Sequence, residues 1–283
     1  MRKKRSVVGF LYGTILGRTL LKMVMKFRLD LAAVRFLCSA WSKPMIPVFM
    51  KLNGISLSRE ERKKYRTYRD FFVRCRAHVD IDHTEGHLIS PCDGWLSMFP
   101  IDGNCCFEIK NSCYSIQDFL QDEELSKNYE GGQCLIFRLE ASDHHHYCYI
   151  DDGFQGRHEM IPGELHSVQP IACEHFPVYV RNRRCWSLLT TENFGPVVEC
   201  EIGALVVGGI YNDKENVRFL KGTEKGHFEI AGSTIVLLFE KGYMEVNEDI
   251  RSKLLSSEET RVVQGQWIGI SKKGKTNNEK NSQ

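Results

Sequence analysis

The chain has 283 residues, of which 42% are hydrophobic and 26% are charged, a balance typical of a globular protein. This composition excludes a collagen, a low-complexity disordered chain and a protein with several membrane spans. The formal net charge is only +2, yet residues 1–53 hold eleven Lys and Arg and a single acid, Asp30, whereas the remainder holds 27 bases and 35 acids. A basic N-terminal segment attached to an acidic remainder predicts that the segment binds an oppositely charged surface.

Cysteine is frequent, with eleven residues, but the number is odd and no Cys-x-x-Cys pair occurs. Proteins held together by disulfides are typically short secreted chains with an even number of cysteines. We therefore expect reduced thiols in a cytosolic protein.

The first 28 residues favour a helix that lies on a membrane surface. Eight bases and no acid precede Asp30, and apolar side chains recur at helical spacing, as in helices that bind anionic bilayers. The apolar positions are Val8, Leu11, Tyr12, Ile15, Leu16, Leu20, Met23, Val24 and Phe27. The uncharged stretch at 6–17 is shorter than the roughly 20 residues that span a bilayer, and no signal-peptide cleavage site follows it. The alternative is a helix packed on its own domain with a solvated basic edge.

The rest of the chain predicts an α+β fold in which a β-rich single domain follows an N-terminal helical, membrane-associating region. Ser58 and Glu61 form a capping-box pattern that starts a helix, and residues 68–74 are amphipathic at helical spacing. From Leu88 onward, short apolar runs separated by glycine indicate strands. The clearest runs are 134–139, 197–210, 235–239 and 262–270, with a helix expected at 116–120.

Residues 232–234 read Gly-Ser-Thr directly before the apolar run at 235–239. On its own this triplet is most typical of a turn. Glycine also permits a bent backbone, however, in which the Ser233 hydroxyl attacks the carbonyl of Gly232. The resulting ester can eliminate and hydrolyse to a pyruvoyl group, a ketone that binds an amine as a Schiff base and accepts electrons as pyridoxal phosphate does.

Two other segments carry ionisable side chains in short motifs. Residues 88–94 hold Asp93 in a tight turn between proline and glycine, and residues 137–153 contain three consecutive histidines, His144, His145 and His146. Other segments in the same order are 109–110, 114–115, 162–165, 181–183 and 203–210. Taken together, these segments resemble the phosphatidylserine decarboxylase family over about residues 65–270, a far more specific signal than Gly-Ser-Thr alone.

The resemblance implies that Ser233 is the serine that becomes the pyruvoyl group, so that the chain cuts itself between Gly232 and Ser233. The products would be a β chain of 232 residues and an α chain of 51 residues that begins with the pyruvoyl group, the Schiff-base site. Asp93 matches the aspartate of the family's catalytic triad, in which a carboxylate orients the histidine that deprotonates the serine.

The histidine segment departs from the family's pattern. Family members usually read Asp-Tyr-His-Arg-x-His, and alignment on Asp143 places His145 on the first histidine and Cys148 on the second, the usual base. His144 then stands at the tyrosine and His146 at the arginine. We expect His145 to be the base, in self-cleavage and in decarboxylation, since strand neighbours point to opposite faces. The sequence leaves open whether His145 alone replaces the histidine missing at position 148.

The implied activity is decarboxylation of phosphatidylserine to phosphatidylethanolamine and CO2, with the self-derived pyruvoyl group as cofactor and no metal. The expected partners are phosphatidylserine in an anionic membrane and the α and β chains of the protein's own cleavage, without nucleic acid; a homo-oligomer is left open. The membrane-association region would cover residues 1–55, the catalytic domain 56–270 and a disordered polar tail 271–283. The expected location is peripheral, on the cytoplasmic face of the cell membrane.

Three other interpretations stay open. A pyruvoyl-dependent decarboxylase of the same lineage could act on a free amino acid or another serine lipid. A non-catalytic membrane-binding relative would explain the missing second histidine and would remain one chain of 32.6 kDa. The three histidines with Cys148 could suggest zinc, but neighbours on a strand cannot all face one ion, and no second ligand pair at zinc spacing follows.

Overall fold

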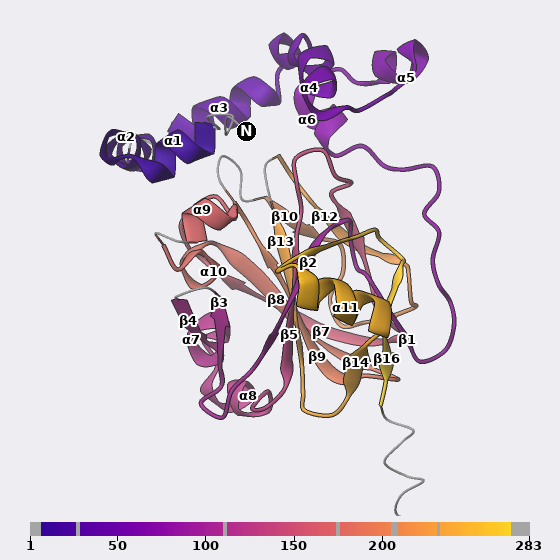
Figure 1. Cartoon of the computed structure of the whole chain (residues 1–283). Helices are drawn as coiled ribbons and strands as arrows, with labels where there is room; N and C mark the ends of the chain where they lie inside the picture. The colour runs from indigo at the N-terminus through magenta and orange to yellow at the C-terminus, as the bar shows by residue number, and fades with distance from the viewer. Residues whose placement is uncertain are drawn as a thin grey trace, which may run out of the picture.

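The computed structural model describes residues 7–26, 29–109, 112–173, 176–204, 209–230 and 233–272. Within these ranges the chain is a mixed α+β protein dominated by antiparallel strands, with a run of helices before the first strand (Figure 1). The predicted α+β, β-rich class is confirmed. No helix of the described ranges is both long and apolar enough to cross a bilayer. Gly232 and the predicted tail from residue 273 onward lie outside the described residues.

The N-terminal helices are short and separate. They are α1 (Val7–Gly13), α2 (Ile15–Lys26), α3 (Leu29–Leu37), α4 (Met45–Asn53), α5 (Arg59–Lys64) and α6 (Tyr68–Phe72), with a 3-10 turn, η1 (Ala40–Ser42), before α4. The single helix predicted for the first 28 residues is therefore wrong in the part that the structure describes, because the chain bends at Thr14, whose hydroxyl donates to the Phe10 carbonyl at 2.9 Å. A Cβ at Gly17 would lie 2.1 Å from that same carbonyl oxygen, so this bend requires glycine.

Helices α1 and α2 pack on the body through one face. Tyr12 and Leu21 are buried in the main core, and the Tyr12 hydroxyl accepts a hydrogen bond from the Ser167 amide at 2.8 Å. Figure 1 shows the N-terminal helices lying across one end of the β-rich body. The interpretation of this segment as a helix packed on its own domain is thus confirmed for that face.

Capping boxes start both helices that lead into the body. At α5, as predicted, the Glu61 amide donates to the Ser58 hydroxyl at 3.2 Å and the Ser58 amide donates to the Glu61 carboxylate at 2.8 Å. Thr67 and Asp70 form the same arrangement at α6. The second box sets the position of Phe72, which reaches the functional site.

The main sheet has eight strands in the order β11-β7-β8-β9-β13-β5-β2-β15. In chain order they are β2 (Gly94–Pro100), β5 (Gln133–Arg138), β7 (Gly153–Ile161), β8 (Arg184–Thr191), β9 (Gly195–Ile202), β11 (Val217–Phe219), β13 (Thr234–Phe239) and β15 (Thr260–Val262). All pairings within it are antiparallel.

Three smaller antiparallel sheets complete the described part. Their orders are β1-β16-β14, β10-β12-β6 and β3-β4. The strands are β1 (His87–Ile89), β3 (Cys106–Ile109), β4 (Ser112–Ser115), β6 (His146–Cys148), β10 (Ile210–Asn212), β12 (Glu224–Phe228), β14 (Met244–Val246) and β16 (Trp267–Ser271).

Strand β13 runs through the centre of the main sheet and is buried along its whole length. Alternate side chains enter two different cores, as the period of a strand requires. Ile235 and Leu237 belong to one core, and Val236 and Leu238 to the other. The core around Val236 is covered by four short helices, and the core around Ile235 receives α11. These helices are α7 (Ile116–Leu120), α8 (Glu123–Lys127), α9 (Pro170–Cys173), α10 (Val178–Arg181) and α11 (Glu248–Ser256).

Two of the runs predicted as strands each divide into two shorter strands. The run at 262–270 is two strands, because a turn at Gly265, with φ at 82°, separates β15 from β16 and directs them into different sheets. The run at 197–210 likewise divides into β9 and β10, and residues 205–208 between them lie outside the described residues. The strands predicted at 134–139 and 235–239 and the helix at 116–120 are confirmed.

Two carboxylates and one ammonium group are buried together beside β9. Lys225 forms an ion pair with Glu201, which also accepts a hydrogen bond from the Asn212 side chain at 3.0 Å. Glu199 lies two residues earlier on the same strand, is fully buried, and has no hydrogen-bond partner in the described part. Burial raises the pKa of Glu199 to about 8, against the attraction of Lys225. At neutral pH Glu199 is therefore protonated, and the cluster carries one charge of each sign.

Glu199→Gln is expected to change how stability depends on pH. The folded chain keeps the Glu199 proton up to about pH 8, whereas the unfolded chain loses it near the ordinary pKa of 4.5. In this window Glu199 should contribute a fall of about 1.4 kcal/mol per pH unit to the free energy of unfolding as the pH rises, and the glutamine variant lacks this contribution. Urea unfolding at several pH values, in an uncut Ser233→Ala background, measures how the free energy of unfolding depends on pH in the parent chain and in Glu199→Gln.

The matched control for this prediction is Glu159→Gln, at an exposed position of β7. It should keep the slope of the parent chain. Parallel curves for the parent and the Glu199→Gln chain would show that Glu199 is ionised in the folded state.

Candidate functional site

Ser233 lies directly before β13, where the chain enters the centre of the main sheet. Its carbonyl oxygen accepts a hydrogen bond from the Leu139 amide at 2.9 Å, which extends the pairing of β13 with β5. Its hydroxyl is buried and has no hydrogen-bond partner among the described residues. A buried, unpartnered hydroxyl is unfavourable for folding and leaves Ser233 free to react. The neighbouring Thr234 has one as well, so the feature alone does not identify the reactive residue.

Asp93 occupies the turn between β1 and β2, as its sequence predicts. Its buried carboxylate pairs with both terminal nitrogens of the Arg76 guanidinium. It also accepts a hydrogen bond from the backbone amide of Gln264 at 3.0 Å. Burial would raise the pKa of Asp93, but the hydrogen bonds from Arg76 and Gln264 outweigh it and lower that pKa, so the group is a carboxylate. At Gly94 a Cβ would lie 2.9 Å from the Arg138 carbonyl oxygen, so the close approach to β5 requires glycine.

The three consecutive histidines point in two directions. His144 and His146 stack with ring centroids 4.8 Å apart, and His146 also stacks on His227 at 5.0 Å. His145 instead packs on Phe72 of α6, with 4.0 Å between centroids. The structure thus separates His145 from its two neighbours, as the alternation of strand side chains predicts.

His145 is fully buried, and neither of its ring nitrogens makes a hydrogen bond within the described part of the chain. Burial, and next the positive charge of Arg74, lower its pKa to about 3. The ring is therefore neutral at pH 7, the form that can accept a proton from a hydroxyl. The His145 carbonyl accepts the Phe228 amide at 2.9 Å, which fixes this segment against β12.

His144 is held on both sides of its ring. Its Nε2 accepts the Arg76 amide at 3.3 Å, and its Nδ1 lies 3.2 Å from the side-chain oxygen of Gln264, which fixes the neutral tautomer with the proton on Nδ1. Burial and the neighbouring His146 lower the pKa of His144 to about 4. Its nitrogens are therefore already engaged, in contrast to those of His145.

Cys148 stands where the family's usual base is expected. The side chain is buried, and burial raises its pKa to about 12, so the thiol keeps its proton at neutral pH. A protonated thiol cannot accept the proton of a serine hydroxyl. Among the residues of the histidine segment, this favours His145 as the base.

The two motif segments meet through their backbones. Asp93 lies 3.5 Å from the His144 amide, and the Pro91 carbonyl accepts the Cys148 amide at 2.9 Å. Within the described part of the chain, Asp93 makes no hydrogen bond to the His145 ring. Asp93 therefore lies beside the histidine segment, with Arg76 as its direct charge partner.

Three residues of this site were missed by sequence reasoning: Phe72, Arg76 and Gln264. Gln264 lies 171 residues from Asp93 in the chain, and no motif links the two. Arg74 and Arg76, two arginines within three residues, were a weak signal of a nearby carboxylate. Phe72 belongs to a predicted helix, but nothing in the sequence showed that it would contact a histidine.

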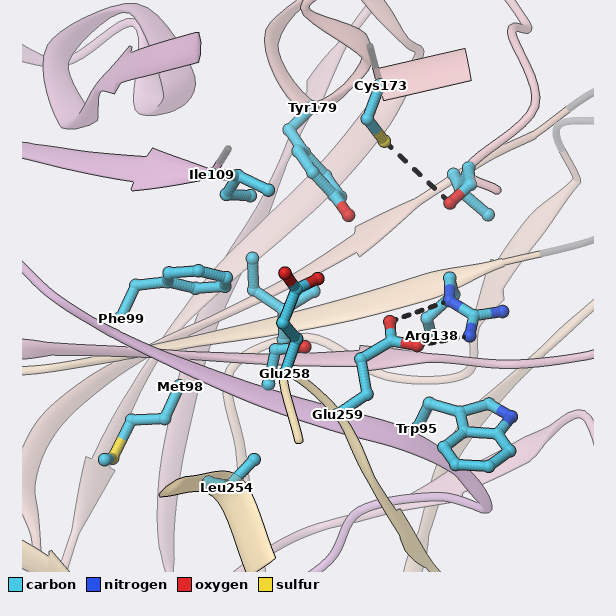
Figure 2. A pocket seen from close by; sticks show the side chains of 13 residues that line it. Trp95, Met98, Phe99, Ile109, Arg138, Cys173, Tyr179, Leu254, Glu258 and Glu259 are labelled. Atoms are coloured by element: carbon cyan, nitrogen blue, oxygen red, sulfur yellow. Dashed lines mark hydrogen bonds and ion pairs between the residues drawn. The ribbon is translucent and has the colours of Figure 1, made fainter. Parts of the chain in front are cut away.

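A pocket of about 500 Å³ is lined mainly by side chains of β2, β5, α10 and α11 (Figure 2). Arg138 forms one side and donates two hydrogen bonds to Glu259, at 3.0 and 2.7 Å. Arg138 pairs through its backbone with Thr234 of β13, but Asp93, His145 and Ser233 are not among the residues that line this pocket. The apolar lining includes Trp95, Met98, Phe99, Ile109, Tyr179 and Leu254. Apolar walls with one ion pair suit an amphipathic ligand.

Comparison with known proteins gives one consistent result. The sequence model of the phosphatidylserine decarboxylase family matches residues 68–270, a range that contains Asp93, His145 and Ser233. The chain is 42% identical over 270 residues to phosphatidylserine decarboxylase proenzyme 2 of Clostridium acetobutylicum, covering 94% of this chain and 92% of that protein.

Two further relatives are described as phosphatidylserine decarboxylase proenzymes. The protein of Clostridium perfringens is 34% identical over 272 residues, covering 93% of this chain and 92% of its own length. The protein of Ruminiclostridium cellulolyticum is 36% identical over 272 residues, covering 93% of this chain and 90% of its own length.

Proposed function

Because this chain belongs to the phosphatidylserine decarboxylase family, we propose that it cuts itself between Gly232 and Ser233 and then converts phosphatidylserine to phosphatidylethanolamine and CO2. The observation that carries this proposal is the Ser233 hydroxyl, which is buried and without a hydrogen-bond partner among the described residues. Such a hydroxyl contributes little to the fold and is free to attack the preceding carbonyl carbon.

The surroundings of Ser233 suit the pyruvoyl group that the family derives from a serine of the chain. The Ser233 carbonyl is anchored by the Leu139 amide, so this end of β13 stays in place when the peptide bond before it is cut. The group supplies a carbonyl that attracts the substrate amine and withdraws electrons as CO2 leaves. The residues of the chain have to hold the substrate, exclude water and move protons.

His145 is the proposed base of self-cleavage. Its neutral ring accepts the proton of the Ser233 hydroxyl, and the same proton is needed on the Ser233 nitrogen when the peptide bond breaks. A ring whose pKa is lowered to about 3 by burial releases that proton readily. In decarboxylation, His145 is likewise the proposed donor of the proton that replaces CO2 on the substrate carbon.

Asp93 has an indirect role in this proposal. Its carboxylate is held by Arg76 and lies against the His144 amide, so it fixes the backbone of the residue that precedes His145. The negative charge beside the histidine segment also favours a transient imidazolium. We therefore propose Asp93 as the residue that positions the base.

The N-terminal region, residues 1–55, is the proposed membrane-binding surface on the cytoplasmic face of the cell membrane. Helices α1 to α4 and the turn η1 leave many apolar side chains exposed, with Ile15 at 79%, Leu16 at 71% and Trp41, on η1, at 84%. The others are Phe10, Leu20, Met23, Phe36, Met45, Val48 and Leu52. Bases accompany them on the same helices, among them Arg18 and Lys51. An apolar surface with excess positive charge fits an anionic bilayer.

A lipid substrate is favoured over a free amino acid by the apolar pocket that Arg138 of β5, the strand beside β13, helps to line. Free serine has no apolar part that would fill a pocket of about 500 Å³ lined by Trp95, Phe99 and Tyr179. A lipid has such a part. A same-lineage enzyme for a soluble amino acid remains the second candidate.

Ile15→Ser with Leu16→Ser is expected to abolish binding to phosphatidylserine vesicles while leaving decarboxylation of detergent-dispersed phosphatidylserine unchanged. The two side chains are exposed and contribute no core contact. Deleting residues 1–28 is a poorer test, because it removes the buried Tyr12 and Leu21. Vesicle co-sedimentation measures binding, and CO2 release measures turnover.

Leu255→Ser is the matched control, because Leu255 is 83% exposed but lies on α11, outside the N-terminal region. It should bind vesicles as the parent chain does. Release of CO2 from free serine but not from phosphatidylserine would contradict the lipid substrate. Equal vesicle binding by all three chains would contradict the proposed membrane surface.

The division into residues 1–55 and 56–270 is retained as part of the proposal, except that β16 continues to Ser271, so the predicted tail of 271–283 has to begin after this residue. Ile46 and Met50 of α4 pack with Phe72 of α6 and with Ile230, close before Ser233. The membrane-binding region is therefore packed on the catalytic domain. Light scattering of the purified protein would establish whether it forms a homo-oligomer.

A further inference from the structure

Three potential metal ligands meet on the sheet that contains β6 and β12. His146 and His227 are direct pairing partners on these neighbouring strands, and Glu224 lies near the start of β12. One donor atom from each of the three residues lies within 4.8 Å of the other two. This cluster has no part in the mechanism proposed above.

The hydrogen bonds of His146 leave a place for a cation. Its Nε2 lies 3.0 Å from the Val73 carbonyl oxygen and 3.5 Å from the Cys75 sulfur. Its Nδ1 faces the Glu224 carboxylate at 2.7 Å. Either a proton or a metal ion can lie between these two atoms.

We propose that His146, Glu224 and His227 bind a divalent transition-metal ion of the zinc class. Two imidazoles and one carboxylate are a common three-ligand set for zinc, with the remaining position taken by water or another donor. The bond from His146 Nε2 to the Val73 carbonyl is the outer contact that metal-binding histidines usually make, and it directs Nδ1 to the ion.

Binding the ion requires side chains of the cluster to move. Zinc bonds of about 2.0–2.2 Å place neighbouring ligand atoms about 3.3 Å apart. The Glu224 carboxylate therefore has to move away from Nδ1, and ligand atoms that lie up to 4.8 Å apart have to approach by a rotation of the stacked His227 ring. The Glu224 side chain is half exposed and free to do so. A pocket of about 160 Å³, lined in part by His146, Glu224 and Cys75, gives an ion access from solvent.

The ion would join β6 to β12 next to the residue proposed as base. His145 precedes His146, and its carbonyl already accepts the Phe228 amide of β12. A metal bridge between His146 and His227 adds a second link across the same two strands. Its expected role is to hold the histidine segment in place, without contact to the reacting atoms.

The test uses full-length protein that has been treated with a chelator. A titration with Zn²⁺ is monitored by calorimetry, and a titration with Co²⁺ is monitored by visible absorption. One ion should bind per chain, and the Co²⁺ spectrum should show the strong bands of a tetrahedral site. His227→Gln should weaken binding by at least about 100-fold, more than the 10- to 100-fold typical of losing an outer contact. His78→Gln, on an exposed histidine paired with Asp80, should change nothing.

Thermal unfolding gives a second measurement that does not depend on activity. Zn²⁺ should raise the melting temperature of the parent chain but not that of Glu224→Gln, whose half-exposed position allows the variant to fold. Absence of saturable binding, or equal affinity in the parent and both ligand variants, would overturn the proposal. The contact between His146 Nδ1 and Glu224 would then be an ordinary hydrogen bond.

Discussion

Ser233→Ala is expected to leave a single uncut chain of 32.6 kDa. The parent chain should instead give chains of 232 and 51 residues, the shorter one without a free N-terminal amine. The reason is that the variant lacks the nucleophile, and no cleavage or pyruvoyl group can form. The buried hydroxyl has no hydrogen bond to lose among the described residues, so the variant should fold at least as stably. Intact mass spectrometry measures the outcome.

Thr234→Val is the matched control for this prediction. Thr234 follows Ser233, is equally buried, and also has a hydroxyl without a partner in the described part of the chain. Valine has the same shape, so the variant should cut itself as the parent does. Cleavage of Ser233→Ala at the same bond, or an uncut parent chain, would contradict the assignment of Ser233.

The strands around Ser233 could be predicted because their physical signals are local. The apolar run at 235–239 is a buried strand on its own evidence, and Ser58 with Glu61 is a complete capping box within four residues. The alternation of neighbouring strand side chains was also sufficient to separate His145 from His144 and His146.

The environment of Asp93 could not be predicted, because its partners come from distant parts of the chain. Arg76 lies on the segment after α6, and Gln264 lies in the turn between β15 and β16. Their approach depends on the order of strands in two sheets, which no short pattern specifies. For the same reason the sequence suggested a direct Asp93–His145 pair, whereas the structure shows a contact to the His144 amide.

The N-terminal helices show a different limit of the sequence. Charge and periodicity offered two alternatives, a membrane-binding helix and a helix packed on its own domain. Tyr12 and Leu21 point into the core, whereas Ile15 and Leu16 are exposed. On α2, Leu21 faces the core while Ile15 and Leu16 lie on the other side of the same helix. The bend at Thr14 separates α1, which carries Tyr12, from α2, and a pattern read as one straight helix could not reveal it.

His145→Ala is expected to slow self-cleavage by at least about 100-fold, the lower range of what a general base contributes. His145 is the histidine of its segment whose ring nitrogens make no hydrogen bond among the described residues, and burial keeps the ring neutral. Losing it removes the acceptor for the Ser233 proton. The rate is measured by following the loss of the uncut chain after synthesis in a cell-free system.

Imidazole distinguishes a chemical role of His145 from a structural one. The alanine variant leaves a space beside Phe72, against which the His145 ring packs at 4.0 Å. Added imidazole should enter this space and restore part of the cleavage rate, whereas a variant that is merely misfolded gains nothing. In His144→Gln, the new side chain can still reach the two polar partners of His144, which are Gln264 and the backbone amide of Arg76. This variant should therefore cut itself much faster than His145→Ala. If His144→Gln were the slower of the two, His144, which lies nearest to Asp93, would have to be the base.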